Sequence, residues 1–196
     1  MCVFIVATLN AQIIDRVLAV VAGQPITLSD VRAALALGLV PPAAAGEKPE
    51  RSALNNLIDR QLQLIEVNRY LPPEPTAAGI DGRVSEIRSR FNGDAAFHAA
   101  LAENGFTADQ LRARVRDNLR IESYLDQRFG VGPEPSEEEL QRFYRSHDFT
   151  RDGTQPPYAE VREEVKRRLV EARKATLIRE WLAGLRRRVD VAVLPM

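Results

Sequence analysis

The chain has 196 residues, of which 45% are hydrophobic, and 27 basic side chains balance 27 acidic ones. This length suits one domain or two small ones, and the apolar fraction is ample for a core. The lack of net charge and an aromatic content of only 6% argue against a nucleic-acid partner.

Residues that carry chemistry are few. Cys2 is the only cysteine, and His98 and His147 are the only histidines. A single cysteine forms no disulfide within the chain and no thiolate metal site. The sequence also contains none of the common phosphate-binding, dinucleotide-binding, zinc-protease or serine-hydrolase motifs. We therefore expect no catalytic residue, no metal site and no cofactor, and we expect His98 to be an ordinary surface residue.

Residues 1–11 resemble the end of a secretory signal peptide. An apolar run from Cys2 to Ala7 is followed by the small residue Ala11 at the expected cleavage position. A positively charged start is missing, and the run is far too short to span a bilayer, which takes about 20 apolar residues. The pattern predicts export, and the alternative is an apolar N-terminal strand that packs on the domain.

Two short Val-rich segments lie near opposite ends of the chain. Residues 17–21 form an apolar run, and residues 189–194 alternate Val with smaller or polar residues. Both patterns are typical of strands. A short strand needs a partner for its backbone groups, so we predict that the two ends pair in one small sheet.

Helical patterns fill most of the chain between these strands. Thr27 is the expected N-cap of a first helix, which ends before Pro41-Pro42. A second helix is predicted from about residue 50 to residue 70. Leu64 and Val67 widen its apolar stripe, so we expect this helix to be covered on more than one side.

Three further helices are predicted between residues 76 and 130. Asp94 is the expected N-cap of the middle one, and Thr107 opens the long third one with a capping box. Apolar residues cluster around the two turns that separate these helices: Phe91, Phe97, Leu101 and Phe106. Together with Leu64 and Val67, they are candidates for an apolar groove, and ordinary core packing is the alternative for each of them.

A linker, a short helix and a long helix are predicted for the remaining chain. Residues 130–135 are rich in Gly and Pro, and Ser136 opens a short helix with another capping box. From Pro157 a single helix is predicted to run to about Arg188, roughly 45 Å at 1.5 Å per residue. Acidic residues interleave with its arginines, so we expect a solvated face and not a nucleic-acid site.

Several of these segments resemble one family, the SurA-type periplasmic chaperones. The segment from Ile14 to Val31 is similar to their mature start, where a strand, a turn and a helix opened by Ser-Asp-Val follow one another. Leu57-Ile58-Asp59-Arg60-Gln61-Leu62 resembles the second helix of their N-terminal domain. Residues 161–165 and 181–186 resemble their last helix, which a closing strand follows. The resemblance covers most of the chain, and it depends on the order of the motifs more than on any one of them.

The chain departs from this family in one respect. Family members usually carry one or two parvulin prolyl-isomerase domains between the N-terminal helices and the last helix. Residues 130–157 are too few for such a domain, and its His-rich and Gly-rich motifs are missing from the sequence. The resemblance therefore implies the chaperone module without the isomerase.

The resemblance implies a mainly α fold, a multi-helix chaperone domain with a small β-sheet formed by the N- and C-terminal strands. Residues 12–130 would form the N-terminal helical domain. Residues 131–157 would be a short helix and linkers at the position of a parvulin domain. Residues 158–196 would be a long helix and a closing strand that pack on the N-terminal domain.

The resemblance also implies a function in protein folding and outer-membrane biogenesis. The protein would be an ATP-independent periplasmic chaperone that binds unfolded polypeptides, such as outer-membrane protein precursors, through the apolar groove. No membrane span is expected, and the client and the oligomeric state stay open. One alternative is a peptidyl-prolyl isomerase relative with a lost or degenerate catalytic domain, and another is an assembly partner in the cell envelope.

Overall fold

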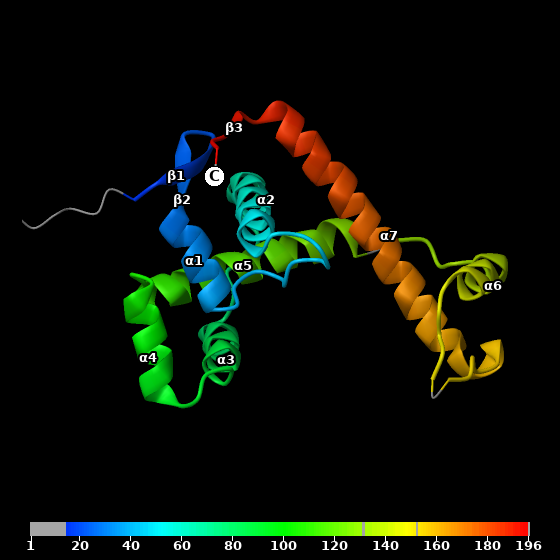
Figure 1. Ribbon diagram of the computed structural model, residues 1–196. Helices are drawn as coiled ribbons and strands as arrows, with labels where there is room; N and C mark the ends of the chain where they lie inside the picture. The colour runs from blue at the N-terminus through cyan, green and yellow to red at the C-terminus, as the bar shows by residue number, and fades with distance from the viewer. Residues whose placement is uncertain (1–14, 131, 152, 196) are drawn as a thin grey trace, which may run out of the picture.

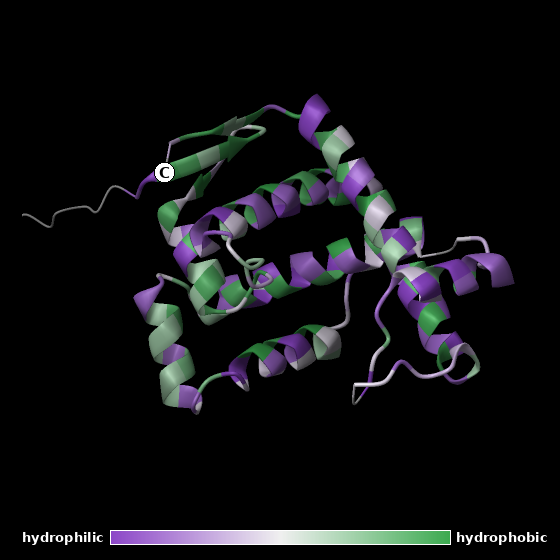
Figure 2. Cartoon of the chain, turned by 45° about the vertical axis from the view of Figure 1, so that its right-hand side comes forward, coloured by the Kyte–Doolittle hydropathy of each residue, from purple (hydrophilic) through white to green (hydrophobic). Residues whose placement is uncertain are grey.

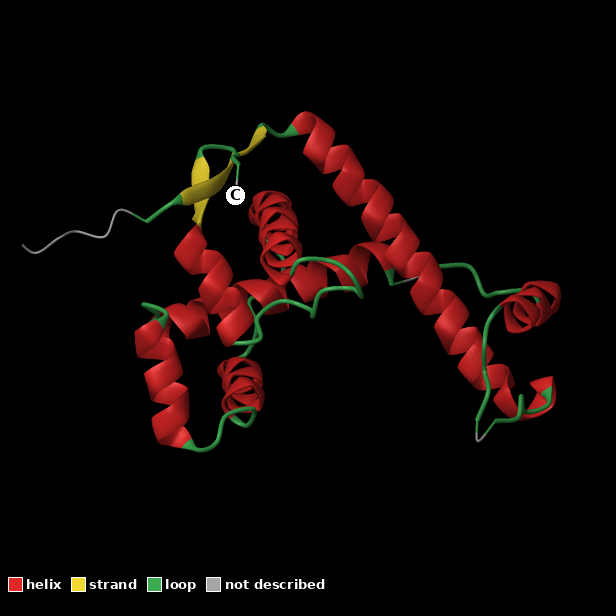
Figure 3. Cartoon of the chain, viewed as in Figure 1, coloured by secondary structure: helices red, strands yellow, loops and turns green. Residues whose placement is uncertain are grey.

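The computed structural model describes residues 15–130, 132–151 and 153–195. Over these residues the order of elements is β1 (Val17–Val21), β2 (Gln24–Thr27), α1 (Leu28–Ala36), α2 (Pro49–Tyr70), α3 (Ala77–Arg88), α4 (Asp94–Glu103), α5 (Ala108–Phe129), α6 (Glu137–Ser146), α7 (Tyr158–Arg188) and β3 (Val191–Val193). The fold is mainly α with one small sheet, as predicted (Figure 3). The predicted signal peptide lies outside the described residues.

The two ends of the described chain pair in this sheet, which confirms the prediction from the Val-rich segments. The strand order is β2-β1-β3, and both pairings are antiparallel. Ala19 lies opposite Val193, and Val21 lies opposite Val191. The N–H of Ala22 also donates to the carbonyl of Asp190 at 2.9 Å, which extends the pairing beyond the strand.

The sequence did not predict strand β2. Ala22 and Gly23 form a two-residue turn with φ angles of 48° and 80°. Two positive φ angles are typical of the tight turn that matches the twist of a hairpin. β2 is short, and its first residues are the exposed Gln24 and Pro25, so no apolar alternation marks it as a strand.

Side-chain caps fix the starts of several helices. Thr27, Thr107 and Ser136 each form a capping box at the start of α1, α5 and α6. The sequence predicted the boxes at Thr107 and Ser136, and an N-cap at Thr27. The prediction for Asp94 was wrong by one position. Gly93 is the N-cap of α4 with a φ of 86°, and Asp94 is in the first turn, where its negative charge faces the helix N-terminus.

Three clusters of buried side chains hold α1–α5 and the sheet together. The first cluster joins the sheet to α1, α2 and the end of α7, with Leu18, Val31, Ile58, Leu62 and Leu185 at its centre. The second joins α3, α4 and α5, and the third joins α2 to α5. Leu64 and Val67 belong to the third cluster, so α2 is covered on two sides as predicted. Figure 2 shows that most helices carry both hydrophobic and hydrophilic residues, as amphipathic helices around small cores do.

Helix α7 connects two lobes of the molecule (Figure 1). It has 31 residues, which is about 46 Å at 1.5 Å per residue. Its C-terminal end packs on the sheet and α1–α5, and we term this assembly the N-terminal lobe. Its first turns hold α6 in a fourth cluster made of Leu140, Phe149, Val161 and Val165. We term α6, residues 147–157 and these first turns the α6 lobe.

Candidate functional site

The six residues predicted to line an apolar groove lie in two of the core clusters. Phe91, Phe97, Leu101 and Phe106 belong to the second cluster, and Leu64 and Val67 to the third. Phe97 and Leu101 are only 4% and 3% exposed, and Val67 is completely buried. These three residues pack as core, Phe97 and Leu101 in the second cluster and Val67 in the third. They offer no surface to a ligand.

Leu64 and Phe106 lie at the edge of their clusters and reach a cavity. This cavity, of about 730 Å³, lies between α1, α2 and the start of α5. Most of its walls are charged or carry amides, so its character differs from the apolar groove expected from the sequence. Phe91 lines neither this cavity nor the surface described next; it is half-buried, with its ring 5.5 Å from that of Phe97.

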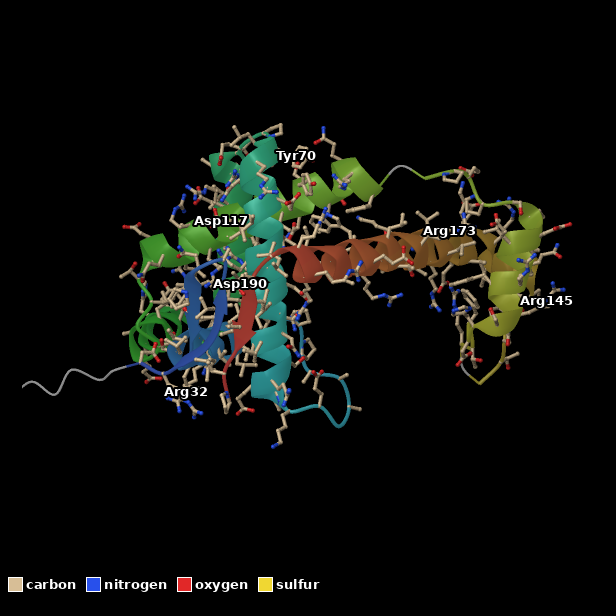
Figure 4. The ribbon with its side chains drawn as sticks, turned by 90° about the horizontal axis from the view of Figure 1, so that it is seen from above. Arg32, Tyr70, Asp117, Arg145, Arg173 and Asp190 are labelled. Carbon is tan, nitrogen blue, oxygen red and sulfur yellow. The ribbon has the colours of Figure 1, made fainter. Side chains whose placement is uncertain are left out.

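A more apolar concave surface lies where the chain between α5 and α6 crosses α7. Two adjoining cavities of about 810 and 330 Å³ share Pro133, Glu134, Arg173 and Leu177. The apolar remainder of their walls comes from Phe129, Pro135, Phe143, Val170 and Ala172. We term this surface the linker groove. Figure 4 shows Arg173 on the stretch of α7 that lies between the two lobes.

An aromatic cluster continues the linker groove onto the N-terminal lobe. The ring of Phe129 lies 5.6 Å from Trp181, Trp181 lies 5.8 Å from Tyr124, and Tyr124 lies 5.5 Å from Tyr70. The guanidinium of Arg128 lies 5.5 to 6.0 Å from the rings of Phe129, Tyr124 and Trp181, a cation–π distance. The linker groove and this cluster together form what we term the apolar track.

Exposure makes the apolar track available for contact. Among the described residues, five large hydrophobic side chains are exposed, and Tyr70, Leu71 and Leu177 are three of them, at 60%, 73% and 47%. Leu71 follows directly after Tyr70, and Leu177 lines both cavities of the linker groove. Exposed apolar side chains that gather around a concave surface are typical of a site that binds another molecule.

Ion pairs border the apolar track. Lys166 pairs with Glu134, Arg173 with Glu139, and Lys174 with Asp126. These mixed charges surround an apolar floor with a polar rim, an arrangement found at protein interfaces.

The length of the last helix is the feature of the sequence that indicates this site. The helix predicted from Pro157 is longer than a compact domain needs, so part of its apolar stripe had to lie beyond the N-terminal lobe. The partners of Leu177, namely Phe129 and the residues 132–135, are distant in sequence, and no local pattern connects them to it.

His147 and Asp148 are each engaged with neighbouring residues. The ring of His147 stacks on Phe143 at 3.8 Å, and its Nδ1 lies 3.0 Å from the carbonyl of Phe143. The carboxylate of the adjacent Asp148 instead accepts the N–H of Thr150. Over residues 15–130, 132–151 and 153–195, no His, Cys, Asp and Glu side chains gather into a metal site. In the same part of the chain, no helix is both long and apolar enough to cross a membrane.

Comparisons with known proteins bear on the fold. No protein-family model matches the sequence, and no curated protein matches it either. Among solved structures, the chain is similar to one from work on PEB4 and the periplasmic protein Cj1289, two structurally related SurA-like chaperones of Campylobacter jejuni. The TM-score is 0.53 at 12% sequence identity, over 93% of this chain and 100% of that one. The fold is SurA-like.

The described residues between α5 and α7 pack on α7. The described residues of the segment 130–157 form α6 and its flanking loops, and Leu140 and Phe149 of this segment pack on α7. The segment therefore contributes to the core of the α6 lobe.

Proposed function

We propose that this protein is a periplasmic holdase chaperone that binds unfolded or outer-membrane-bound polypeptides without ATP. Its SurA-like fold supports a chaperone-type function. The observation that carries the proposal is the apolar track, in which the exposed Leu177 lines a concave surface and the exposed Tyr70 belongs to the adjoining aromatic cluster. The proposal moves the binding surface away from Phe97, Leu101 and Val67, because these residues are buried.

An extended client segment would lie along the track with its apolar side chains against Leu177 and the aromatic cluster. Burial of these side chains provides the affinity, at about 25 cal/mol per Å² of apolar surface. The freedom of motion that both molecules lose on association offsets most of this gain, so each segment binds weakly. Weak binding suits a holdase, since the client leaves by dissociation alone, and the charged rim keeps the complex in solution.

Aggregation of a chemically unfolded client, followed by light scattering, tests the proposal. The wild-type protein is expected to suppress aggregation at a near-stoichiometric ratio without nucleotide. The double variant Tyr70→Ser, Leu177→Ser removes two exposed side chains of the track, and we expect it to bind the client about tenfold more weakly. Both residues are largely exposed, so the variant keeps its helical circular dichroism.

The matched control is Leu194→Ser. Leu194 is also an exposed leucine, at 41%, but it follows β3 and is not part of the track. We expect this variant to suppress aggregation like the wild type. A folded double variant with full activity would contradict the proposed surface, and a wild-type protein without activity would contradict the function.

A further inference from the structure

The polar cavity between α1, α2 and the start of α5 lies apart from the apolar track. Its walls carry three arginines, three carboxylates and three amides, namely Arg32, Arg60, Arg114, Asp30, Glu103, Asp117, Gln61, Asn104 and Gln110. Figure 4 shows Arg32 and Asp117 on the N-terminal lobe, away from α6. The numbers of basic and acidic side chains are equal, but not every arginine has a carboxylate as its partner.

Two of the carboxylates are already engaged. Asp117 lies 3.4, 2.9 and 3.9 Å from the guanidinium groups of Arg60, Arg116 and Arg120. Asp30 accepts the N–H and the hydroxyl of Thr27, both at 2.9 Å, in the cap of α1. Arg120 also pairs with Glu74 at 3.2 Å, so Asp117 is shared mainly by Arg60 and Arg116. One carboxylate does not neutralise both of these guanidinium groups.

Arg114 has no ion-pair partner within 4 Å among the described residues. Its side chain is half-buried, and the nearby Arg60 side chain is 17% exposed. Burial, together with the charge of Arg114, lowers the pKa of Arg60 to about 10. Burial also lowers the pKa of Arg114, although the charges of Asp30 and Asp117 oppose this shift. The third carboxylate of the walls, Glu103, is exposed and forms no ion pair with either arginine. The half-buried charge of Arg114 beside a second guanidinium therefore favours a bound anion.

The rest of the cavity indicates what kind of anion fits. Leu64, Phe106 and Ala113 form apolar walls beside the arginines. Gln61, Asn104 and Gln110 carry amide groups, which can exchange hydrogen bonds with peptide groups. Asn104 already donates to the carbonyl of Ala100, and Gln110 already accepts the N–H of Thr107, both at 2.8 Å, so each of these two has one amide atom left for a ligand. The volume of about 730 Å³ exceeds that of a small inorganic ion and suits several residues of a peptide.

We infer that this cavity binds an acidic segment of a client polypeptide, with an Asp or Glu carboxylate between Arg60 and Arg114. An apolar side chain next to that carboxylate packs on Leu64 and Phe106. That the ligand is a polypeptide rests on the proposed function. Arg60 already donates from Nε to Asn118 and from Nη2 to Asp117. The two parallel hydrogen bonds that make a guanidinium–carboxylate contact selective would therefore come from Arg114. The cavity would then add a preference for acidic clients to the apolar binding along the track.

Two short peptides test this inference by fluorescence anisotropy. Both have capped ends and a Phe, and one carries a Glu beside the Phe where the other carries a Gln. Wild-type protein is expected to bind the Glu peptide about tenfold more tightly, and added salt is expected to reduce this advantage. Arg114→Gln is expected to abolish the advantage.

The control variant is Arg167→Gln, which removes an exposed arginine of α7 outside the cavity and should retain the preference. Equal binding of the two peptides by the wild type would overturn the inference. So would a preference that survives in Arg114→Gln. The comparison of the two peptides on the wild type needs no variant, so it stands even where a substitution perturbs folding. An uncapped Gln peptide that binds more tightly than the capped Glu peptide would overturn it in favour of a site for chain ends.

These outcomes separate the inference from the proposed function. Equal binding of both peptides, with aggregation still suppressed, would contradict the site for acidic segments but not the holdase function. No binding of either peptide, with aggregation unchecked, would remove both.

Discussion

Phe97 and Leu177 show how the position of one apolar side chain decides what it contributes. Phe97 packs with Leu101, Leu111 and Val115 between α4 and α5 and is 4% exposed. Leu177 is 47% exposed at the linker groove. The first side chain contributes to stability because it is removed from water. The second gains little from folding and remains available to a partner.

At this scale we predict opposite effects for two truncations. Phe97→Ala should lower the free energy of unfolding by about 3–5 kcal/mol, since it removes a ring from a packed cluster. Leu177→Ala should change it by no more than about 0.5–1 kcal/mol. Urea denaturation of both variants measures the difference. If both variants lost a similar free energy of unfolding, Phe97 would contribute no more to stability than the exposed Leu177. That result would contradict its role as a core residue.

Helix α6 illustrates how an element is held by charged groups as well as by its core. The carboxylate of Glu137 accepts the hydroxyl of Tyr158 at 2.7 Å and pairs with Arg162. Glu139 accepts the N–H of Ser136 at 2.7 Å and pairs with Arg173. These hydrogen bonds, with Tyr158 and Ser136 foremost, lower the pKa of both carboxyl groups from the usual 4.5.

The direction of these shifts predicts that acid releases α6 before the N-terminal lobe unfolds. A carboxyl group with a lowered pKa stabilises the folded state above its unfolded value, here 4.5, and the contribution is lost as the pH falls through the folded pKa. Hydrogen exchange measured by NMR between pH 6 and pH 3 follows the amides of α6 and α5. We expect α6 to lose protection at the higher pH, and simultaneous loss in both helices would contradict this.

Replacement of one of these carboxyl groups provides the control for the acid experiment. Glu137→Gln removes the titrating group and its pairing with Arg162 but leaves the cap at Ser136 in place. We expect α6 to be less protected at neutral pH in this variant and to respond less to acid than in the wild type.

The whole molecule depends on the pairing of its two ends. β3 lies beside β1, and Leu185, Val189 and Val191 pack on the first cluster. Through this contact the sheet fixes one end of α7 on the N-terminal lobe. The other end of α7 carries the α6 lobe (Figure 1). Leu177 and Trp181 of the apolar track lie on the stretch of α7 between the two ends. The shape of the candidate binding surface therefore depends on a sheet at the far end of α7.

At this scale we predict that deletion of residues 189–196 lowers the melting temperature by several degrees or more. The deletion removes β3 and uncovers the edge of β1, whose backbone groups then lack partners. Thermal unfolding followed by circular dichroism measures the shift. Val193→Ser is the control, because it changes a side chain that is 55% exposed and leaves the backbone pairing in place. An unchanged melting curve for the deletion would contradict the role of the terminal sheet.

Most elements of this fold follow from the sequence because their signals are local. The capping boxes at Thr27, Thr107 and Ser136 mark three helix starts within four residues each. The Val-rich ends predict strands, and the need of each strand for a partner predicts their pairing. The sequence did not predict β2, because its conformation depends on the backbone angles of Ala22 and Gly23. No apolar pattern indicates these angles.

The candidate sites, in contrast, were decided by the tertiary structure. An apolar stripe indicates that a helix face is covered, but it does not say which residues the neighbouring helices reach. Phe97 is covered by α5, while Leu177 lies on a part of α7 that extends past the N-terminal lobe. Arg60 and Arg114 belong to different helices, and only the packing of α2 against α5 brings their charges together. Local propensity thus determined the elements, whereas burial and electrostatics, which depend on distant segments, determined the surfaces available for binding.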